Sequence, residues 1–325
     1  RKEAALTAEE VEALWPLVLM RLAVSVTNSG LRKVEFPDDP YVVISERPAL
    51  ALLQRARDMD DRFVALRLRQ AAGLPVSPPC PKLPEHLEAR MFEVDLAGAA
   101  ILDLTPDNLR LSANQSHPRA EELDAVVDAA LGAGGPVLGR YGEARLIYGG
   151  ESFGRTDHVA RRRRTVHIGV DVFLPPETAV HAVLPGTVVS AAYRAAQHDY
   201  GGILILEHEC ADGSRFRALY GHLSRASAEG SQVGQRFAAG EVVARLGDVD
   251  ENGGWPPHLH LQISGNDAPE DGGLWPGVVD PDDWDLWRQL FPNPAALLGL
   301  DAAQIDARPS GLDVMTHRRG AMTAA

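Results

Sequence analysis

Four histidines and one aspartate in the second half of the sequence have spacings that suit metal chemistry. His258 and His260 are two residues apart, so on a strand both side chains point to the same side of the sheet. His167 and Asp171 are four residues apart, and they also share a side if their segment is extended. His222 lies between these two pairs. The five residues can meet at one site if the strands that carry them lie together.

The residue types match the ligands of a catalytic zinc ion. Zinc accepts imidazole nitrogens and carboxylate oxygens at about 2.0–2.2 Å, and three protein ligands leave a fourth position for water. The ion lowers the pKa of that water to about 7 and polarises a carbonyl group. Further histidines can act as a base and stabilise the tetrahedral oxyanion. The pattern predicts metal-assisted hydrolysis of a peptide or amide bond.

The segment around these residues, from about residue 138 to 264, has the pattern of short strands separated by glycine turns. The apolar run at residues 203–206 is typical of a strand that is buried on both faces. Asp212-Gly213 predicts a hairpin turn before a strand at residues 216–223. This pattern favours an all-β sandwich or barrel over a βαβ fold. Further strands are predicted over residues 178–183, 187–190 and 258–263.

Residues 1–75 are predicted to be helical. Thr7 and Glu10 have the spacing of a capping box in front of an apolar run at residues 11–26. A second helical stretch is predicted over residues 48–72. Two helices do not easily enclose a core, so we expect this region to belong to a larger helical domain.

Two other segments are predicted to connect folded parts of the chain. Residues 76–135 begin with closely spaced prolines, which block helices and central strands, and contain one short predicted helix at residues 121–131. The β-rich domain then covers residues 136–265. Residues 266–325 are predicted to be an acidic tail or linker.

Composition and charge exclude several classes of protein. Of the 325 residues, 45% are apolar and 24% are charged, as in ordinary globular proteins. A net charge of −13 argues against a broad nucleic-acid or anionic-membrane surface, so no nucleic-acid partner is expected. The two cysteines, Cys80 and Cys210, are too few for a disulfide scaffold or a multi-cysteine zinc site.

The N-terminal apolar stretch at residues 15–20 ends at Arg21, which is short of the roughly 18–20 apolar residues that cross a bilayer. No signal-peptide pattern is visible. We therefore expect no membrane span in this chain and a cytoplasmic location. The first residue is Arg rather than Met, which indicates a fragment.

The order of three motifs resembles the lysostaphin-type (LytM-like) zinc metallopeptidases, which cut peptide bonds in bacterial peptidoglycan. The motifs are H-x-x-x-D at residues 167–171, Tyr-Gly-His-Leu at residues 220–223 and H-x-H at residues 258–260. The resemblance spans about residues 140–265 and includes glycine-containing segments at residues 185–189, 200–202, 233–235 and 239–241. It implies a mainly β fold, an antiparallel sheet or sandwich with a duplicated hybrid motif, after an α-helical segment.

The same resemblance implies a role for each of the five residues. His167, Asp171 and His260 would ligate one zinc ion per chain. His222 and His258 would orient the water and stabilise the transition state. The substrate would be a peptide or a peptidoglycan-like polymer.

Two neighbouring segments bear on the substrate. Residues 252–257 read Asn-Gly-Gly-Trp-Pro-Pro where the family has a short Gly/Ser turn, and Trp255 with the two prolines would narrow the cleft. Four consecutive arginines, Arg161 to Arg164, precede His167. They fit either a solvated loop or a clamp for an anionic substrate.

The N-terminal region has a resemblance of its own. Residues 6–10 and 21–29 resemble the C-terminal helices of aminoglycoside-phosphotransferase-like kinases. The order fits a bacterial fusion of such a kinase with a lysostaphin-type domain and a class III aminotransferase. The kinase's catalytic H-x-D loop and the aminotransferase's cofactor lysine motif are absent, so neither activity is expected of this chain.

Two functions stay open for the β-rich domain. The first is an active zinc metalloendopeptidase, which the complete set of five residues favours. The second is a zinc-binding but non-hydrolytic module within a larger kinase/aminotransferase fusion, which the missing signal sequence and the narrowed cleft favour. A calcium loop at residues 248–253 is excluded because Leu259 occupies the position of the bidentate glutamate.

Overall fold

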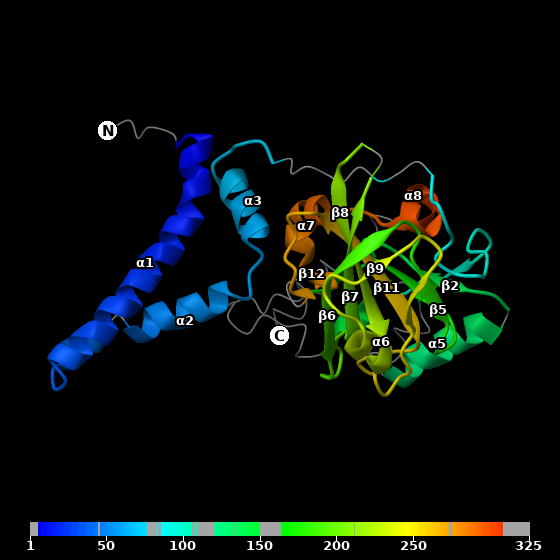
Figure 1. Cartoon of the computed structure of the whole chain (residues 1–325), viewed down its shortest axis with the longest axis horizontal. Helices are drawn as coiled ribbons and strands as arrows, with labels where there is room; N and C mark the ends of the chain where they lie inside the picture. The colour runs from blue at the N-terminus through cyan, green and yellow to red at the C-terminus, as the bar shows by residue number, and fades with distance from the viewer. Residues whose placement is uncertain are drawn as a thin grey trace. The chain divides into compact units, whose positions relative to one another are not determined.

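The computed structural model divides the chain into two compact units. The first consists of residues 1–78 with residues 273–275, and the second of residues 79–272 with residues 276–325. Figure 1 labels the elements of both. The structure describes residues 6–44, 46–76, 83, 86–105, 108, 120–132, 134–149, 164–210, 212–272 and 275–307.

The first unit is helical, as predicted. The hydroxyl of Thr7 accepts a hydrogen bond from the Glu10 amide at 3.3 Å, and Glu10 Oε2 accepts one from the Thr7 amide at 2.8 Å, so the capping box is confirmed. The predicted second helix is two helices, because Asp60 caps a new one by accepting from the Arg62 amide at 2.9 Å. The elements are α1 (Ala8–Glu35), η1 (Pro40–Val43), α2 (Glu46–Ala56) and α3 (Asp61–Ala71).

Helix α1 is, among the described residues, the one helix long and apolar enough to cross a membrane. The expectation of no membrane span rested on the short uninterrupted apolar run before Arg21, and it stays a prediction. A signal sequence and the core helix of a soluble protein meet the same criterion. One such helix is weak evidence and assigns no compartment.

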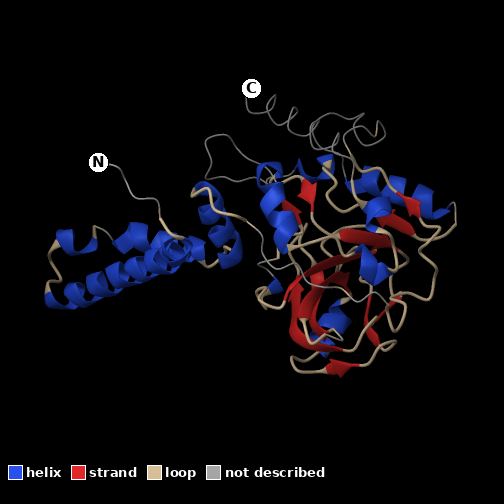
Figure 2. Cartoon of the chain, turned by 90° about the horizontal axis from the view of Figure 1, so that it is seen from above, coloured by secondary structure: helices blue, strands red, loops and turns tan. Residues whose placement is uncertain are grey.

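The second unit is built on an eight-stranded sheet (Figure 2). Its strand order is β1-β2-β4-β11-β8-β7-β6-β9, and all neighbours are antiparallel except β1 and β2. Two further pairs, β5 with β10 and β3 with β12, form separate two-stranded sheets. The predicted mainly β fold is confirmed for this unit. The strands are β1 (Ala100–Ile101), β2 (Val137–Gly139), β3 (Val166–His167), β4 (Val170–Phe173), β5 (Ala179–His181), β6 (Gly186–Arg194), β7 (Gly201–Glu209), β8 (Arg215–Leu223), β9 (Arg236–Phe237), β10 (Val242–Arg245), β11 (His258–Gly265) and β12 (Val278–Val279).

Strand β7 lies between β8 and β6 in the sheet. Residues 203–206 are fully buried, so the predicted strand with two buried faces is confirmed. The predicted hairpin leads from β7 into β8, and Gly213 in its turn has φ = 79°, a conformation that favours glycine. Strand β8 in turn pairs with β11, which carries the H-x-H motif.

The segments predicted as connectors also contribute elements to this unit. The short helix is confirmed as α5 (Ala120–Gly132), and β1 adds an edge strand. Most of the proline-rich start at residues 77–85 lies outside the described residues.

The described part of the predicted acidic tail is folded. Strand β12 pairs with β3, and helix α7 (Trp284–Leu290) buries Leu286 and Leu290. The Ser264 hydroxyl on β11 donates a hydrogen bond to the Leu290 carbonyl at 2.6 Å. The acidic composition predicted a tail or linker here, and these buried apolar residues were missed. The remaining helical turns of the unit are η2 (Leu146–Gly149), α6 (Arg225–Gly230), η5 (Pro281–Asp283), η6 (Ala295–Leu298) and α8 (Ala302–Ile305).

Candidate metal centre

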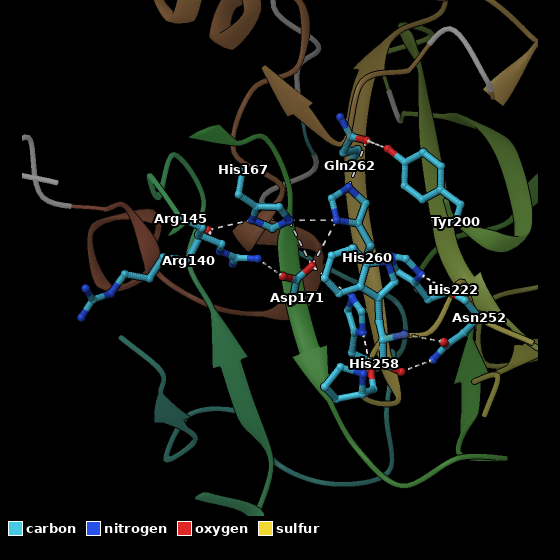
Figure 3. Close-up of polar contacts among 12 residues, drawn as sticks. Arg140, Arg145, His167, Asp171, Tyr200, His222, Asn252, His258, His260 and Gln262 are labelled. Atoms are coloured by element: carbon cyan, nitrogen blue, oxygen red, sulfur yellow. Dashed lines mark hydrogen bonds and ion pairs between the residues drawn. The ribbon is translucent and has the colours of Figure 1, made fainter. Parts of the chain in front are cut away.

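Three side chains from three strands converge on one point (Figure 3). His167 Nε2 and His260 Nδ1 are 2.9 Å apart, and each lies 3.1 Å from Asp171 Oδ1. All three residues are at most 3% exposed. Among the residues that the structure describes, they form the group of potential ligands that could hold a metal ion. The three ligand residues predicted from the sequence therefore lie together.

Strand register places two of them. Strand β11 pairs with β4 so that His260 lies directly opposite Asp171. Directly opposite residues of an antiparallel pair have Cβ atoms about 4.5–5.5 Å apart, within reach of a shared ion. The same alternation brings His258 to the face that carries His260.

The third ligand residue, His167, does not share a strand with Asp171. Ile168 and Gly169 separate β3 from β4, and β3 pairs with β12 instead. The extended segment assumed from the four-residue spacing is therefore absent, and a bend brings the two side chains together. A Cβ atom on Gly169 would lie 2.5 Å from Cε1 of His260, so this close approach requires glycine.

Hydrogen bonds fix which nitrogen of each ligand histidine carries a lone pair. The Arg140 carbonyl can only accept, so His167 Nδ1, 2.9 Å away, must be its donor, which leaves Nε2 without a hydrogen. His260 Nε2 donates to Gln262 Oε1 at 3.0 Å, which leaves Nδ1 free in the same way. Gln262 is itself oriented, because its amide nitrogen donates to the Pro276 carbonyl and its oxygen accepts from the Tyr200 hydroxyl. Partners of this kind orient metal ligands in known sites.

The donor set fits a zinc ion. Ligands of a tetrahedral ion at about 2.0–2.2 Å lie about 3.3–3.6 Å apart, within a few tenths of an ångström of the distances here. Two nitrogen lone pairs and a carboxylate oxygen at such distances repel one another unless a cation lies among them. His167, Asp171 and His260 would hold that cation.

Two further histidines, His222 and His258, lie beside this group. Their rings are 4.2 Å apart between centroids, and His258 Nε2 lies 3.8 Å from Asp171 Oδ1. His222 Nδ1 donates to the Asn252 carbonyl at 2.8 Å, and His258 Nδ1 donates to the Pro256 carbonyl at 2.7 Å. Each Nε2 therefore carries a lone pair. His222 has φ = 60°, an unusual backbone conformation for a non-glycine residue that often marks functional sites.

Burial controls the protonation of these groups. It lowers the pKa of His167 to about 4 with help from Arg145, and it holds the pKa of His222 and of His258 below the ordinary range. Burial alone would raise the pKa of Asp171, but the Arg145 guanidinium beside it helps to hold that pKa well below its usual value. Neutral imidazoles and an ionised carboxylate are the forms that bind a metal.

The loop with Trp255 is tied to the site through Asn252. The buried Asn252 side chain accepts from the Trp255 amide at 3.0 Å and donates to the Trp255 carbonyl at 2.8 Å. The carbonyl of Asn252 accepts from His222. The indole of Trp255 contacts the rings of Tyr148 and His198. This loop, which departs from the family pattern, thus positions His222.

Two residues that contact the candidate ligands, Gln262 and Arg145, were not predicted from the sequence. Gln262 lies two residues after His260, so strand alternation could have placed it on the same face. Arg145 precedes Asp171 by 26 residues, and no local pattern links them. Of the four-arginine run, residues 161–163 lie outside the described residues.

The comparisons with known proteins found a family model and similar solved structures. The family model described as Peptidase family M23 matches residues 165–271. The catalytic domain of lysostaphin from Staphylococcus simulans is 26% identical, with 37% of this chain and 79% of that chain covered and a TM-score of 0.26. A zinc-containing peptidase from Vibrio cholerae is 25% identical. The match covers 34% of this chain and 30% of the Vibrio chain, with a TM-score of 0.26. This chain thus spans less than a third of the Vibrio protein's length.

The search of curated proteins found no match. These findings do not support the kinase and aminotransferase parts of the predicted fusion. The motif order, the strands and the family model all concern the same segment. Residues 165–271 are therefore the part of this chain that is similar to peptidase family M23.

Proposed function

We propose that this domain is a zinc-dependent metalloendopeptidase that hydrolyses peptide bonds, with peptidoglycan-like peptides as its substrate class. The observation that supports this most directly is the convergence of three lone pairs, on His167 Nε2, His260 Nδ1 and Asp171 Oδ1, with both tautomers fixed by hydrogen bonds. The M23 match and its peptidase neighbours support hydrolysis as the reaction.

The protein groups have separate tasks in this proposal. A zinc ion, when bound, supplies a water molecule of lowered pKa and polarises the scissile carbonyl. His222 and His258 have their Nδ1 hydrogens engaged by backbone carbonyls, so their Nε2 atoms are available to accept a proton from water. A histidine that has taken up a proton then stabilises the oxyanion and donates to the departing amine.

A second function, zinc binding without hydrolysis, has one observation in its favour. The five residues are between 1% and 7% exposed, whereas a peptide substrate must reach the fourth coordination position. A buried centre of this kind suits a structural or binding module.

Two variants separate these functions. We expect His260→Ala to lose the zinc that elemental analysis finds in the parent, about one ion per chain. We expect His222→Ala to keep that zinc but to lose hydrolysis of peptidoglycan fragments and small amides. The matched control is His181→Ala, since His181 on β5 contacts the Met91 carbonyl and not the site. A parent that binds no added zinc contradicts both functions, and a His222→Ala variant as active as the parent contradicts the catalytic assignment.

A further inference from the structure

Asp171 has two oxygen atoms in different surroundings. Oδ1 faces the imidazoles of His167 and His260 at 3.1 Å. Oδ2 accepts a hydrogen bond from Nη1 of Arg145 at 2.7 Å. One oxygen is thus directed to the candidate ion and the other to a guanidinium group.

Arg145 is itself buried and firmly held. Its side chain is 2% exposed, and its Nε donates to Glu143 Oε2 at 2.9 Å. Glu143 is fully buried, and its other oxygen accepts from the Leu104 amide at 3.1 Å. Such a chain of buried charges is a poor source of stability, because desolvation offsets much of the attraction.

The neighbouring strand is shaped around this contact. Gly139 on β2 lies opposite Asp171 on β4. A Cβ atom on Gly139 would lie 2.7 Å from Arg145 Nη2 and 3.0 Å from Asp171 Oδ2. The absence of a side chain at this position therefore lets Arg145 reach the carboxylate. Both Gly139 and Arg145 precede the segment matched by the family model.

We propose that Arg145 is a positioning residue that restricts Asp171 to a single-oxygen metal ligand. With Oδ2 engaged by Arg145, only Oδ1 is offered to the ion, and the fourth coordination position stays open for water. Without Arg145, the carboxylate can turn and bind through both oxygens, which fills that position. This inference rests on the proposed zinc-dependent function.

The test uses the full chain and three substitutions at two positions. Arg145→Met removes the guanidinium, Arg145→Lys keeps a buried cation without the planar fork, and Gly139→Ala pushes a methyl group into the contact. The controls are Arg217→Met, which removes another buried arginine paired with Glu207 and Glu270, and Gly98→Ala, where nothing lies within 4 Å. Zinc affinity is measured by competition with a chelator, and folding by circular dichroism.

We expect Arg145→Met to weaken zinc binding about 10- to 100-fold, as substitutions of ligand-orienting residues do. Arg145→Lys and Gly139→Ala should show smaller losses, and both controls should bind as the parent does. With Co²⁺ in place of zinc, the visible absorption of the Arg145 variants should weaken, because a carboxylate bound through both oxygens raises the coordination number. If Arg145→Met does not fold, the Lys and Gly139 variants carry the same test.

The outcomes separate this inference from the proposed function. The positioning role alone is overturned if the parent binds zinc and the folded variants at Arg145 and Gly139 bind it equally tightly. In that case the variants would also give the Co²⁺ spectrum of the parent. An Arg217→Met variant that loses as much affinity as the Arg145 variants also overturns it, because the effect is then general. A parent without zinc affinity overturns both the role and the function.

Discussion

At the Arg217 end of the β8–β11 pair, buried charge is satisfied by protein partners and by solvent. Arg217 contacts Glu207 and Glu270, and the Glu270 side chain is 64% exposed. At the other end of the same pair, His260 lies opposite Gly221, and the donors around His260 are almost fully buried. Both ends use the same strand pairing and the same kind of polar residues.

The two ends differ in how their charged and polar side chains are arranged. Arg217 has two carboxylates of opposite charge beside it, those of Glu207 and Glu270. At the metal centre, His167 Nε2 and His260 Nδ1 face each other with lone pairs, because their other nitrogens hold the hydrogens. The comparison teaches that the same strand pairing can bury an arginine between opposite charges at one end and bring neutral imidazoles and a carboxylate together, as a candidate metal centre, at the other.

The largest expected effect comes from closing the space at the metal centre. Gly169→Ala would place a methyl group 2.5 Å from His260 Cε1 and 2.8 Å from the Leu261 carbonyl oxygen. Because the backbone cannot easily move, we expect a loss of about 1–3 kcal/mol in the free energy of unfolding and a large loss of zinc affinity. Urea unfolding and chelator competition measure the two effects. Gly98→Ala should change neither, and a Gly169→Ala variant with the parent's zinc affinity would show that the bend is not needed.

A smaller effect is expected at the loop that holds His222. Asn252→Ala removes two hydrogen bonds to the Trp255 backbone. We expect the free energy of unfolding to fall by about 1–3 kcal/mol, as is usual when buried polar groups are left without partners. Hydrolysis should fall while zinc affinity stays at the parent level, since Asn252 contacts His222 and none of the three ligands. The control is Asn293→Ala, which removes a similar side-chain contact to the Ala295 amide. Equal kcat values for parent and Asn252→Ala would argue against positioning of His222 by this loop.

The smallest effect concerns pH at the Arg217 end of the sheet. Burial lowers the pKa of His208 on β7 below its ordinary value of 6.5. The unfolded chain therefore takes up a proton near pH 6.5 while the folded chain stays neutral, so the free energy of unfolding falls as pH decreases below about 6.5. Urea unfolding at about pH 7.5 and pH 5.5 measures this loss. In His208→Gln the loss should be smaller than in the parent, and an identical loss would contradict the prediction.

Much of the fold could be predicted from local patterns. The capping box at Thr7 and the doubly buried strand at residues 203–206 depend on neighbouring residues alone, and both are confirmed. The division of the second helix was missed, because the cap at Asp60 interrupts an otherwise helical pattern. The folded part of the acidic tail was missed as well, since it is held by contacts with distant segments, such as the pairing of β12 with β3.

The sequence by itself identified the five candidate residues, through the spacing within each motif and through the family resemblance that the order of the motifs carries. It also determined that His258 and His260 share a face. The tertiary structure alone decided how His167 reaches Asp171, through a bend at Gly169 and a pairing of β3 with β12. It alone placed Arg145 on Asp171. The physical reason is that spacing fixes the direction of a side chain along one strand, whereas contacts between distant segments depend on register and on the space that burial leaves.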